Sequence, residues 1–270
     1  MSASILTAWP KLAASPAAFA HCKLLRQLSE LDVVQSQPSN AQSQCWLDYS
    51  DSTLAIHALA TNLPPLTSLD LINIWQHRLK SYRGNQEPLL KAIGKRARQG
   101  RVIDLTAGLG RDSMVMAKAG AQVTLLEQHP LIVCLLIDAI EKAERITALK
   151  PISARLQVCW QDAFFWLEHE SNQTTVSFDA WYCDPMFEHA TNKTARNKRP
   201  MQILQACNAN VSQQPLAGFA LAHLSGNTKL VVKRSRSSVA STEGLNHQID
   251  GKNWRLDIYL NSGPKSSASP

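Results

Sequence analysis

The sequence of 270 residues has no apolar run that approaches the roughly 18 residues needed to cross a bilayer. Its N-terminus also lacks the charged start and the unbroken apolar stretch of a signal peptide, because Pro10 and Pro16 interrupt it. We therefore expect no membrane partner and a cytoplasmic location.

Paired cysteines and metal-binding spacings are missing as well. The six cysteines stand singly, with no CxxC pair and no Cys/His spacing of the zinc type. We therefore expect reduced cysteines in the core and no metal ion.

Acidic residues are the minority among the charges. The chain has 28 Lys and Arg against 21 Asp and Glu, which gives a formal net charge of +7. With 44% hydrophobic and 18% charged residues, the composition is that of a globular protein. A positive field attracts polyanions, so nucleic acid is the leading candidate partner.

The pattern of elements changes along the chain. Residues 1–68 contain a polar stretch at 35–44 and an alternating segment that turns at Ser50 and Asp51, which is typical of a hairpin. Helical patterns follow from residue 69, and from residue 101 short β-rich runs alternate with helical runs, which predicts an α/β fold with a mostly parallel sheet. We expect a small β-containing N-terminal subdomain at 1–68, a main domain at 69–262 and a flexible tail at 263–270.

The first of these β-rich runs ends at Asp104, and a loop with Gly108 and Gly110 leads from it into a helix. Glycine has no Cβ, so the backbone can turn sharply and approach a ligand that lies over the strand end. The loop is not a dinucleotide fingerprint, because Ser113 stands where the third glycine belongs. We place Asp104, Gly108 and Gly110 in a cofactor site, with a plain glycine turn as the alternative.

The second β-rich run ends at Glu127, where an acid can accept both hydroxyls of a ribose. Asp112 adds a negative charge beside the start of the first helix. A cationic ligand without phosphates, such as S-adenosyl-L-methionine, therefore fits better than NAD. A solvated strand end is the alternative for Glu127.

The third run is followed by Asp162 and Ala163. Asp162 is placed to accept a hydrogen bond from an adenine amino group, while the backbone of Ala163 reads the edge of the ring. Asp is also a favoured N-cap residue of helices. The two roles are compatible, and both stay open.

The fourth run ends in Asp184-Pro185-Met186-Phe187. The exocyclic amino group of a nucleobase is a poor nucleophile, because its lone pair is delocalised into the ring. The carboxylate of Asp184 and the carbonyl of Pro185 can accept its two hydrogens, while Phe187 stacks on the base. We predict that these three residues are catalytic, with a structural turn as the alternative.

Together, the segments DLTAGLGRD, LLEQHP, YCDPMF, LVVKR, WRLDIY and HRLKSYRG resemble the ribosomal RNA small subunit methyltransferase J family over roughly residues 69–260. The resemblance implies a class I, Rossmann-like methyltransferase fold and transfer of methyl from S-adenosyl-L-methionine to a guanine N2 of 16S rRNA. It implies cofactor contacts at Arg111, Asp112, Glu127, Gln128, Asp162, Ala163 and Asp184. The chain departs from the family at Gln128, often Arg there, and at Asp162-Ala163, where the family has two small hydroxyl residues.

Basic residues are expected to border the same crevice. Lys198 and Arg199 follow the Asp-Pro segment, and Lys233 and Arg234 end a later strand. We predict that they contact RNA phosphates, with a solvated charged face as the alternative. The resemblance adds Arg83 as part of a lip that faces RNA.

These observations predict N2 methylation of a guanosine in 16S rRNA, with rRNA or the small ribosomal subunit as partner. Two alternatives stay open. One is a methyltransferase for adenine N6 or a protein amide, because both purine amines satisfy the same geometry. The other is a non-catalytic RNA-binding protein on the same fold.

Overall fold

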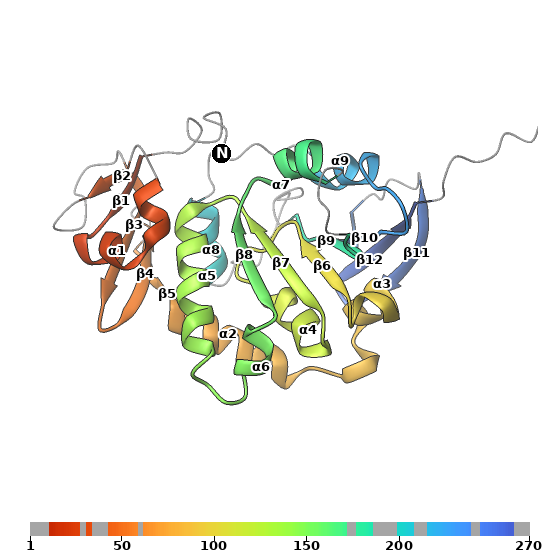
Figure 1. Cartoon of the computed structure of the whole chain (residues 1–270), viewed down its shortest axis with the longest axis horizontal. Helices are drawn as coiled ribbons and strands as arrows, with labels where there is room; N and C mark the ends of the chain where they lie inside the picture. Colours follow the sequence, from red (N-terminus) through yellow and green to blue (C-terminus); the bar gives the residue numbers. More distant parts are fainter. Residues whose placement is uncertain are drawn as a thin grey trace, which may run out of the picture.

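The computed structural model describes residues 11–27, 31–33, 43–58, 62–171, 177–185, 199–207, 215–238 and 244–261. Two β-sheets organise this part of the chain, a five-stranded sheet at the N-terminal end and a seven-stranded sheet that carries helices (Figure 1). None of the helices described combines the length and apolar character that a bilayer crossing needs.

The first sheet has the strand order β2-β1-β3-β4-β5. Its strands are β1 (Lys11–Ala14), β2 (Leu31–Val33), β3 (Ser43–Ser50), β4 (Thr53–Ala58) and β5 (Leu66–Thr67). The helix α1 (Pro16–His21) and the 3-10 helix η2 (Lys23–Gln27) accompany them. The predicted hairpin is confirmed, since β3 and β4 pair antiparallel with Ser50 opposite Thr53.

The second sheet has the order β11-β12-β10-β9-β6-β7-β8. Its strands are β6 (Arg101–Asp104), β7 (Gln122–Glu127), β8 (Leu156–Trp160), β9 (Ala180–Cys183), β10 (Lys229–Ser235), β11 (Leu245–Asp250) and β12 (Trp254–Leu260). The five strands β8, β7, β6, β9 and β10 are parallel, and β12 lies antiparallel between β10 and β11. The predicted α/β fold with a mostly parallel sheet is confirmed.

Helices connect and cover these strands (Figure 1). They are α2 (Ser68–Lys80), η3 (Gly84–Gln86), α3 (Pro88–Ala97), α4 (Arg111–Ala119), α5 (Pro130–Ala143), α6 (Lys150–Ser153), α7 (Ala163–Phe165), the π-helical turn η4 (Trp166–Glu170), α8 (Arg199–Cys207) and α9 (Leu216–Ala222). α2 begins with a capping box, in which the Thr67 hydroxyl accepts from the Asp70 backbone and the Asp70 carboxylate accepts from the Thr67 backbone.

The hydrophobic core passes from the first sheet into the second. Buried residues of β3 and β4, such as Leu47 and Ile56, belong to the same cluster as Leu135 of α5 and Val231 of β10. The first sheet ends at Thr67, and α2 begins at the next residue. The division of the chain at residue 68 stays a prediction, and 263–270 lies outside the described residues.

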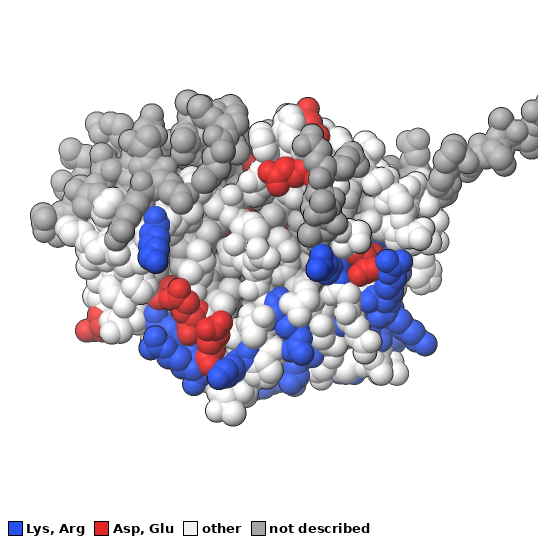
Figure 2. Space-filling model, viewed as in Figure 1, with Lys and Arg blue, Asp and Glu red and all other residues white. Residues whose placement is uncertain are grey.

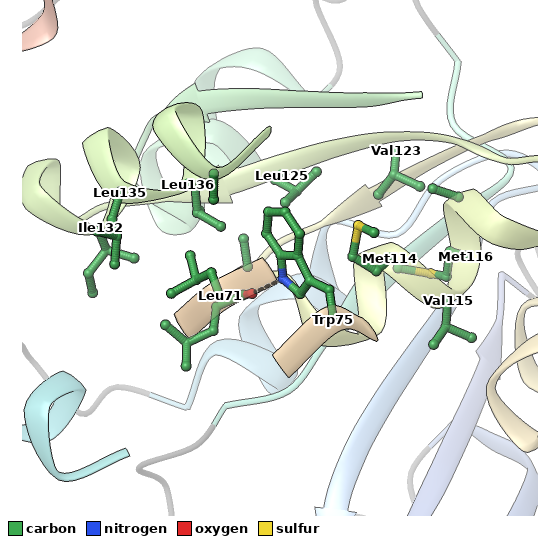
Figure 3. Close-up of a cluster of buried hydrophobic side chains, with 14 of the residues drawn as sticks. Leu71, Trp75, Met114, Val115, Met116, Val123, Leu125, Ile132, Leu135 and Leu136 are labelled. Carbon is green, nitrogen blue, oxygen red and sulfur yellow. Dashed lines mark hydrogen bonds between the residues drawn. The ribbon is translucent and has the colours of Figure 1, made fainter. Parts of the chain in front are cut away.

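Trp75 of α2 is the largest fully buried side chain in this core. Figure 3 shows its indole pointing into a cluster built from α2, α4, α5 and β7. The indole nitrogen donates a 2.7 Å hydrogen bond to the carbonyl of Leu109. The core therefore also fixes the loop that follows β6.

The structure corrects the expectation about the cysteines and adds a strand that was not predicted. Cys45 is disulfide-bonded, so the prediction that all six cysteines are reduced is wrong for this residue, whereas Cys22, Cys134, Cys159 and Cys183 are free. The strand β11 was not predicted, because most of its side chains are exposed and it shows no apolar alternation.

Candidate active site

A cavity of about 1130 Å³ lies against the carboxyl ends of β6, β9 and β10. Its wall carries the carboxylates of Asp104, Asp112 and Asp184, which come from three separate segments of the chain. Thr106, Gly108, Arg111, Tyr182, Pro185 and Lys233 also line it. The crevice at the strand ends is where open α/β sheets bind ligands.

The glycine loop forms one side of this cavity. Gly108 and Gly110 have φ angles of 50° and 67°, in the left-handed region that favours glycine. A Cβ on Gly110 would come within 3.3 Å of the Leu136 side chain. The backbone of the turn therefore favours glycine at both positions, and packing also restricts Gly110.

Glu127 ends β7 directly beside this loop. One carboxylate oxygen accepts a 2.9 Å hydrogen bond from the Gly108 backbone N–H, and the other accepts one of 2.8 Å from the His129 backbone N–H. Burial raises the pKa of Glu127 to about 7, although these hydrogen bonds oppose the shift. Each oxygen has a second lone pair, so the carboxylate can still accept hydroxyl groups.

Asp104 is buried at the end of β6. Its carboxylate accepts hydrogen bonds from the Ser113 hydroxyl and from the backbone N–H of Thr106. Burial also raises the pKa of Asp104 to about 7. Asp104 therefore ties the loop to the start of α4.

Lys233 of β10 joins two carboxylates inside the cavity. Its ammonium lies 2.8 Å from Asp112 Oδ2 and 2.7 Å from Asp184 Oδ2. The Tyr182 hydroxyl donates a 2.6 Å hydrogen bond to Asp112, and the Arg78 guanidinium lies 3.9 Å from that carboxylate. Burial alone would raise the pKa of Asp112, but these groups, with Lys233 foremost, lower it to about 2.

Asp184 is held from a second direction by the first loop. Its backbone N–H donates a 2.7 Å hydrogen bond to the Thr106 hydroxyl. Burial raises the pKa of Asp184, and the neighbouring Asp112 raises it further, while Lys233 acts against both. The loop after β6 and the segment after β9 are therefore one connected unit.

The comparison with known proteins agrees with this geometry. Residues 29–261 match a family model described as "Putative SAM-dependent methyltransferase". A ribosomal RNA small subunit methyltransferase J from Chromobacterium violaceum is 30% identical over 261 residues, which cover 94% of this chain and 97% of that protein. The chain belongs to the ribosomal RNA small subunit methyltransferase J family.

Other members and a solved structure support the assignment. A methyltransferase J from Laribacter hongkongensis is 38% identical over 196 residues, which cover 71% of this chain and 67% of that protein. The crystal structure of a SAM-dependent methyltransferase from Neisseria gonorrhoeae matches with a TM-score of 0.69 and 25% identity, over 96% of this chain and 99% of that one. The chain is thus an S-adenosylmethionine-dependent methyltransferase with the class I, Rossmann-like fold.

The site fits the cofactor of the methyltransferase J family. The turn at Gly108 and Gly110 leaves room above the strand ends, and the carboxylates in the cavity wall suit a cationic ligand. The Glu127 carboxylate lies against the glycine loop, where it accepts from the Gly108 backbone. The residues that would hold the cofactor are therefore those of the glycine loop, Glu127 and the acids of the cavity.

The residues at the end of β8, the third predicted strand, do not line the cavity in this methyltransferase J. Asp162 caps α7, because its carboxylate accepts a 2.9 Å hydrogen bond from the Phe165 backbone. Ala163 is buried, and the carbonyl of Gln128 accepts from the Trp160 indole. Among the described residues, Glu127, Gln128, Asp162 and Ala163 lie outside the cavity wall. The N-cap role of Asp162 is confirmed, and adenine recognition stays a prediction.

Three of the cations that are expected to contact RNA phosphates form ion pairs in the structure. Lys233 is engaged by two carboxylates, and Arg234 is paired with the fully buried Asp257 at 3.2 Å. Neighbouring residues of a strand point to opposite faces, so the two cations meet different acids. Their contacts with RNA phosphates stay predictions. Arg199 pairs with Asp70 at 2.6 Å.

Arg83 is exposed and lines the cavity, and no ion pair is recorded for it within the described residues. Phe187 and Lys198 fall outside those residues, so their predicted roles stay predictions. The sequence analysis gave no role to Thr106 and Tyr182, which also line the cavity. Tyr182 stands two residues before Asp184 on β9, so strand periodicity could have indicated it.

One group of described residues could hold a metal ion, namely His21, Asp138 and Glu141, between α1 and α5. Asp138 already accepts from the Lys142 ammonium, from His21 and from the Leu54 backbone. None of the three lines the cavity described above. The absence of a metal ion stays a prediction.

Proposed function

We propose that the protein transfers a methyl group from S-adenosylmethionine to the exocyclic N2 of a guanosine in 16S rRNA, in the cytoplasm. The observation that carries this proposal is the placement of Asp184, whose carboxylate and backbone are both held at the cavity wall beside the glycine loop. The relatives named ribosomal RNA small subunit methyltransferase J support the substrate class.

The proposed chemistry begins with the target amine. Bound S-adenosylmethionine supplies an activated methyl group on a positively charged sulfur. The Asp184 carboxylate and the Pro185 carbonyl accept the two amino hydrogens and so turn the nitrogen lone pair toward the methyl group. The nitrogen gains positive charge as it attacks, and the anion of Asp184 stabilises that charge.

The proton needs no strong base. The methylated amine is far more acidic than the neutral one, so its proton can pass to Asp184 or to water after the transfer. Lys233 favours the ionised form of Asp184, since its ammonium contacts the carboxylate at 2.7 Å. Lys233 is therefore a positioning residue in this proposal.

The surface charge supports a polyanionic substrate. Figure 2 shows Lys and Arg side chains along the lower edge of the face in view, with a few acidic side chains among them. The net charge of +7 favours the approach of RNA before specific contacts form.

Methyl transfer to defined acceptors tests the proposal. The purified protein should transfer labelled methyl to small-subunit rRNA or to small ribosomal subunits that lack the modification, and the label should appear in N2-methylguanosine. Comparing free rRNA with assembled subunits identifies the form that is bound. Label in N6-methyladenosine or in protein would contradict the proposal.

Replacing Lys233 with methionine should move the acid limb of the rate profile to higher pH. The ammonium lowers the pKa of Asp184, so its loss lets burial and Asp112 raise that pKa further and reduces the ionised fraction at a given pH. Single-turnover rates at saturating S-adenosylmethionine measure this, and Lys233→Arg should keep the profile near that of the wild type. An unmoved acid limb in the methionine variant would remove Lys233 from this role.

Cofactor affinity should depend on pH through Glu127. Its pKa is raised to about 7 in the free protein, and ribose hydroxyls donate to its ionised form. The affinity is therefore expected to rise between about pH 5 and pH 7 and then to level off. In Glu127→Gln, calorimetry should show binding weaker by about 1 to 3 kcal/mol and a smaller dependence on pH.

Asp104 also titrates near pH 7, so Asp104→Asn serves as the matched variant for this measurement. The Asp104→Asn variant should still show the rise in cofactor affinity that the ionisation of Glu127 causes. A pH dependence that is unchanged in Glu127→Gln would show that this carboxylate does not bind the cofactor.

A further inference from the structure

Trp254, the first residue of β12, lines the same cavity as Asp184. Its side chain is partly buried and packs against the main hydrophobic cluster. The indole of Trp254 is a large flat apolar surface that the cofactor site described above does not use.

The strand register places Trp254 close to the reacting groups. In the antiparallel pair of β10 and β12, Lys233 lies opposite Leu256 and Ser235 lies opposite Trp254. Directly opposed residues point to the same face, as do residues two apart on one strand. Trp254 is therefore on the face that carries Lys233, about 7 Å further toward the carboxyl end of β10.

The turn before β12 fixes the indole. A Cβ on Gly251 would clash with Trp254 Cε2, so the indole lies directly against the glycine backbone. The Gly251 N–H also donates a 2.8 Å hydrogen bond to the Trp254 carbonyl. The aromatic ring is thus supported from one side by the turn.

Two exposed cations line the same cavity as this aromatic surface. Arg83, just after α2, and Lys252, in the turn before β12, are exposed and line the cavity. For neither of them is an ion pair recorded within the described part of the chain, whereas Arg78 pairs with Glu87 and Lys233 with two aspartates. An aromatic surface and basic side chains in one groove are the combination that binds single-stranded nucleic acid.

We infer that the Trp254 indole is the stacking surface for the nucleobase that enters the cavity, and that Arg83 and Lys252 contact the phosphates on either side of it. This inference rests on the proposed function, because it takes RNA as the substrate. It assigns base recognition to the turn between β11 and β12, in addition to the Asp184 segment. Stacking is tolerant of base identity, so Trp254 supplies affinity and orientation, while the hydrogen-bond acceptors at Asp184 address the amine.

Replacing Trp254 with alanine should weaken binding of small-subunit rRNA by about 5- to 150-fold, the range for loss of one stacked base. Trp254→Phe keeps a ring and should stay within a few-fold of the wild type. Cofactor affinity, measured by calorimetry on the same preparations, should change less than two-fold in both variants, which also shows that they are folded. RNA binding that is unchanged in Trp254→Ala would overturn the inference.

A second variant, Gly251→Ala, keeps Trp254 but displaces its indole. Gly251→Ala places a methyl group where the indole lies, so it should also weaken RNA binding while cofactor affinity is kept. Wild-type RNA binding in both Gly251→Ala and Trp254→Ala would place base recognition elsewhere. A wild-type enzyme that binds cofactor but transfers no methyl to small-subunit rRNA would instead overturn the proposed function.

The cations are tested by the salt dependence of RNA binding. Arg83→Gln and Lys252→Gln should each lower the slope of log K against log salt by about 0.7 to 0.9, as expected for one lost phosphate contact. Lys118→Gln is the control, because Lys118 is exposed on α4 and does not line the cavity. Equal slopes in all three variants would remove the phosphate contacts from the inference.

Discussion

The variant Asp184→Ala is expected to transfer methyl about 10² to 10⁴ times more slowly than the wild type while it folds normally. The range is that for loss of a positioned polar or proton-accepting group. The carboxylate stabilises the charge that develops on the amine, so its removal raises the barrier more than it weakens ground-state binding. The measurement is single-turnover methyl transfer at saturating S-adenosylmethionine, because the same carboxylate can also touch the cofactor.

Asp184→Asn is the matched variant for this prediction. It keeps a hydrogen-bond acceptor of the same size but loses the charge, so its rate should lie between those of the wild type and the alanine variant. If the rate of Asp184→Ala stays within a few-fold of the wild type, the segment after β9 is a structural turn and Asp184 has no catalytic role.

Trp75→Ala is expected to lower the free energy of unfolding by about 3 to 5 kcal/mol, the usual cost of truncating a fully buried aromatic residue. Trp75 is 0% exposed and lies in the cluster shown in Figure 3. Denaturant unfolding followed by circular dichroism measures the change.

Trp75→Phe separates packing from the hydrogen bond. It keeps most of the ring but cannot donate to the Leu109 carbonyl, so the glycine loop loses one of its anchors. We expect a smaller loss of stability together with weaker binding of S-adenosylmethionine. If Trp75→Phe binds the cofactor as the wild type does, the indole serves the core only and does not position the loop.

Much of the fold could be predicted from the sequence, because its strands and helices carry strong local patterns. The runs that became β6, β7, β8 and β9 are short and apolar, and helical runs separate them. The order of these elements dictates a parallel sheet whose carboxyl ends meet at one edge. That edge is why Asp104, Gly108, Asp112 and Asp184 could be grouped before any distance was known.

The pairing of charges could not be predicted in the same way. Lys233 and Arg234 are neighbours in sequence, but one points to the cavity and the other to Asp257. The acid that pairs with Arg234, Asp257, belongs to β12. This strand follows β10 in the chain and lies beside it in the sheet. The position of Trp254 could not be predicted for the same reason, since only the register of β10 and β12 brings it to the face that carries Lys233.

The central claim is tested most directly by the nucleosides of the small-subunit RNA. Mass spectrometry of this RNA from cells that lack the gene should show less N2-methylguanosine than the parent strain, at one site. Incubating the undermethylated RNA or its subunits with the purified protein and S-adenosylmethionine should restore the methyl group, whereas the Asp184→Ala variant should fail to do so in the same time. An unchanged content of N2-methylguanosine in the deletion strain, or a different methylated nucleoside restored by the protein, would contradict the account.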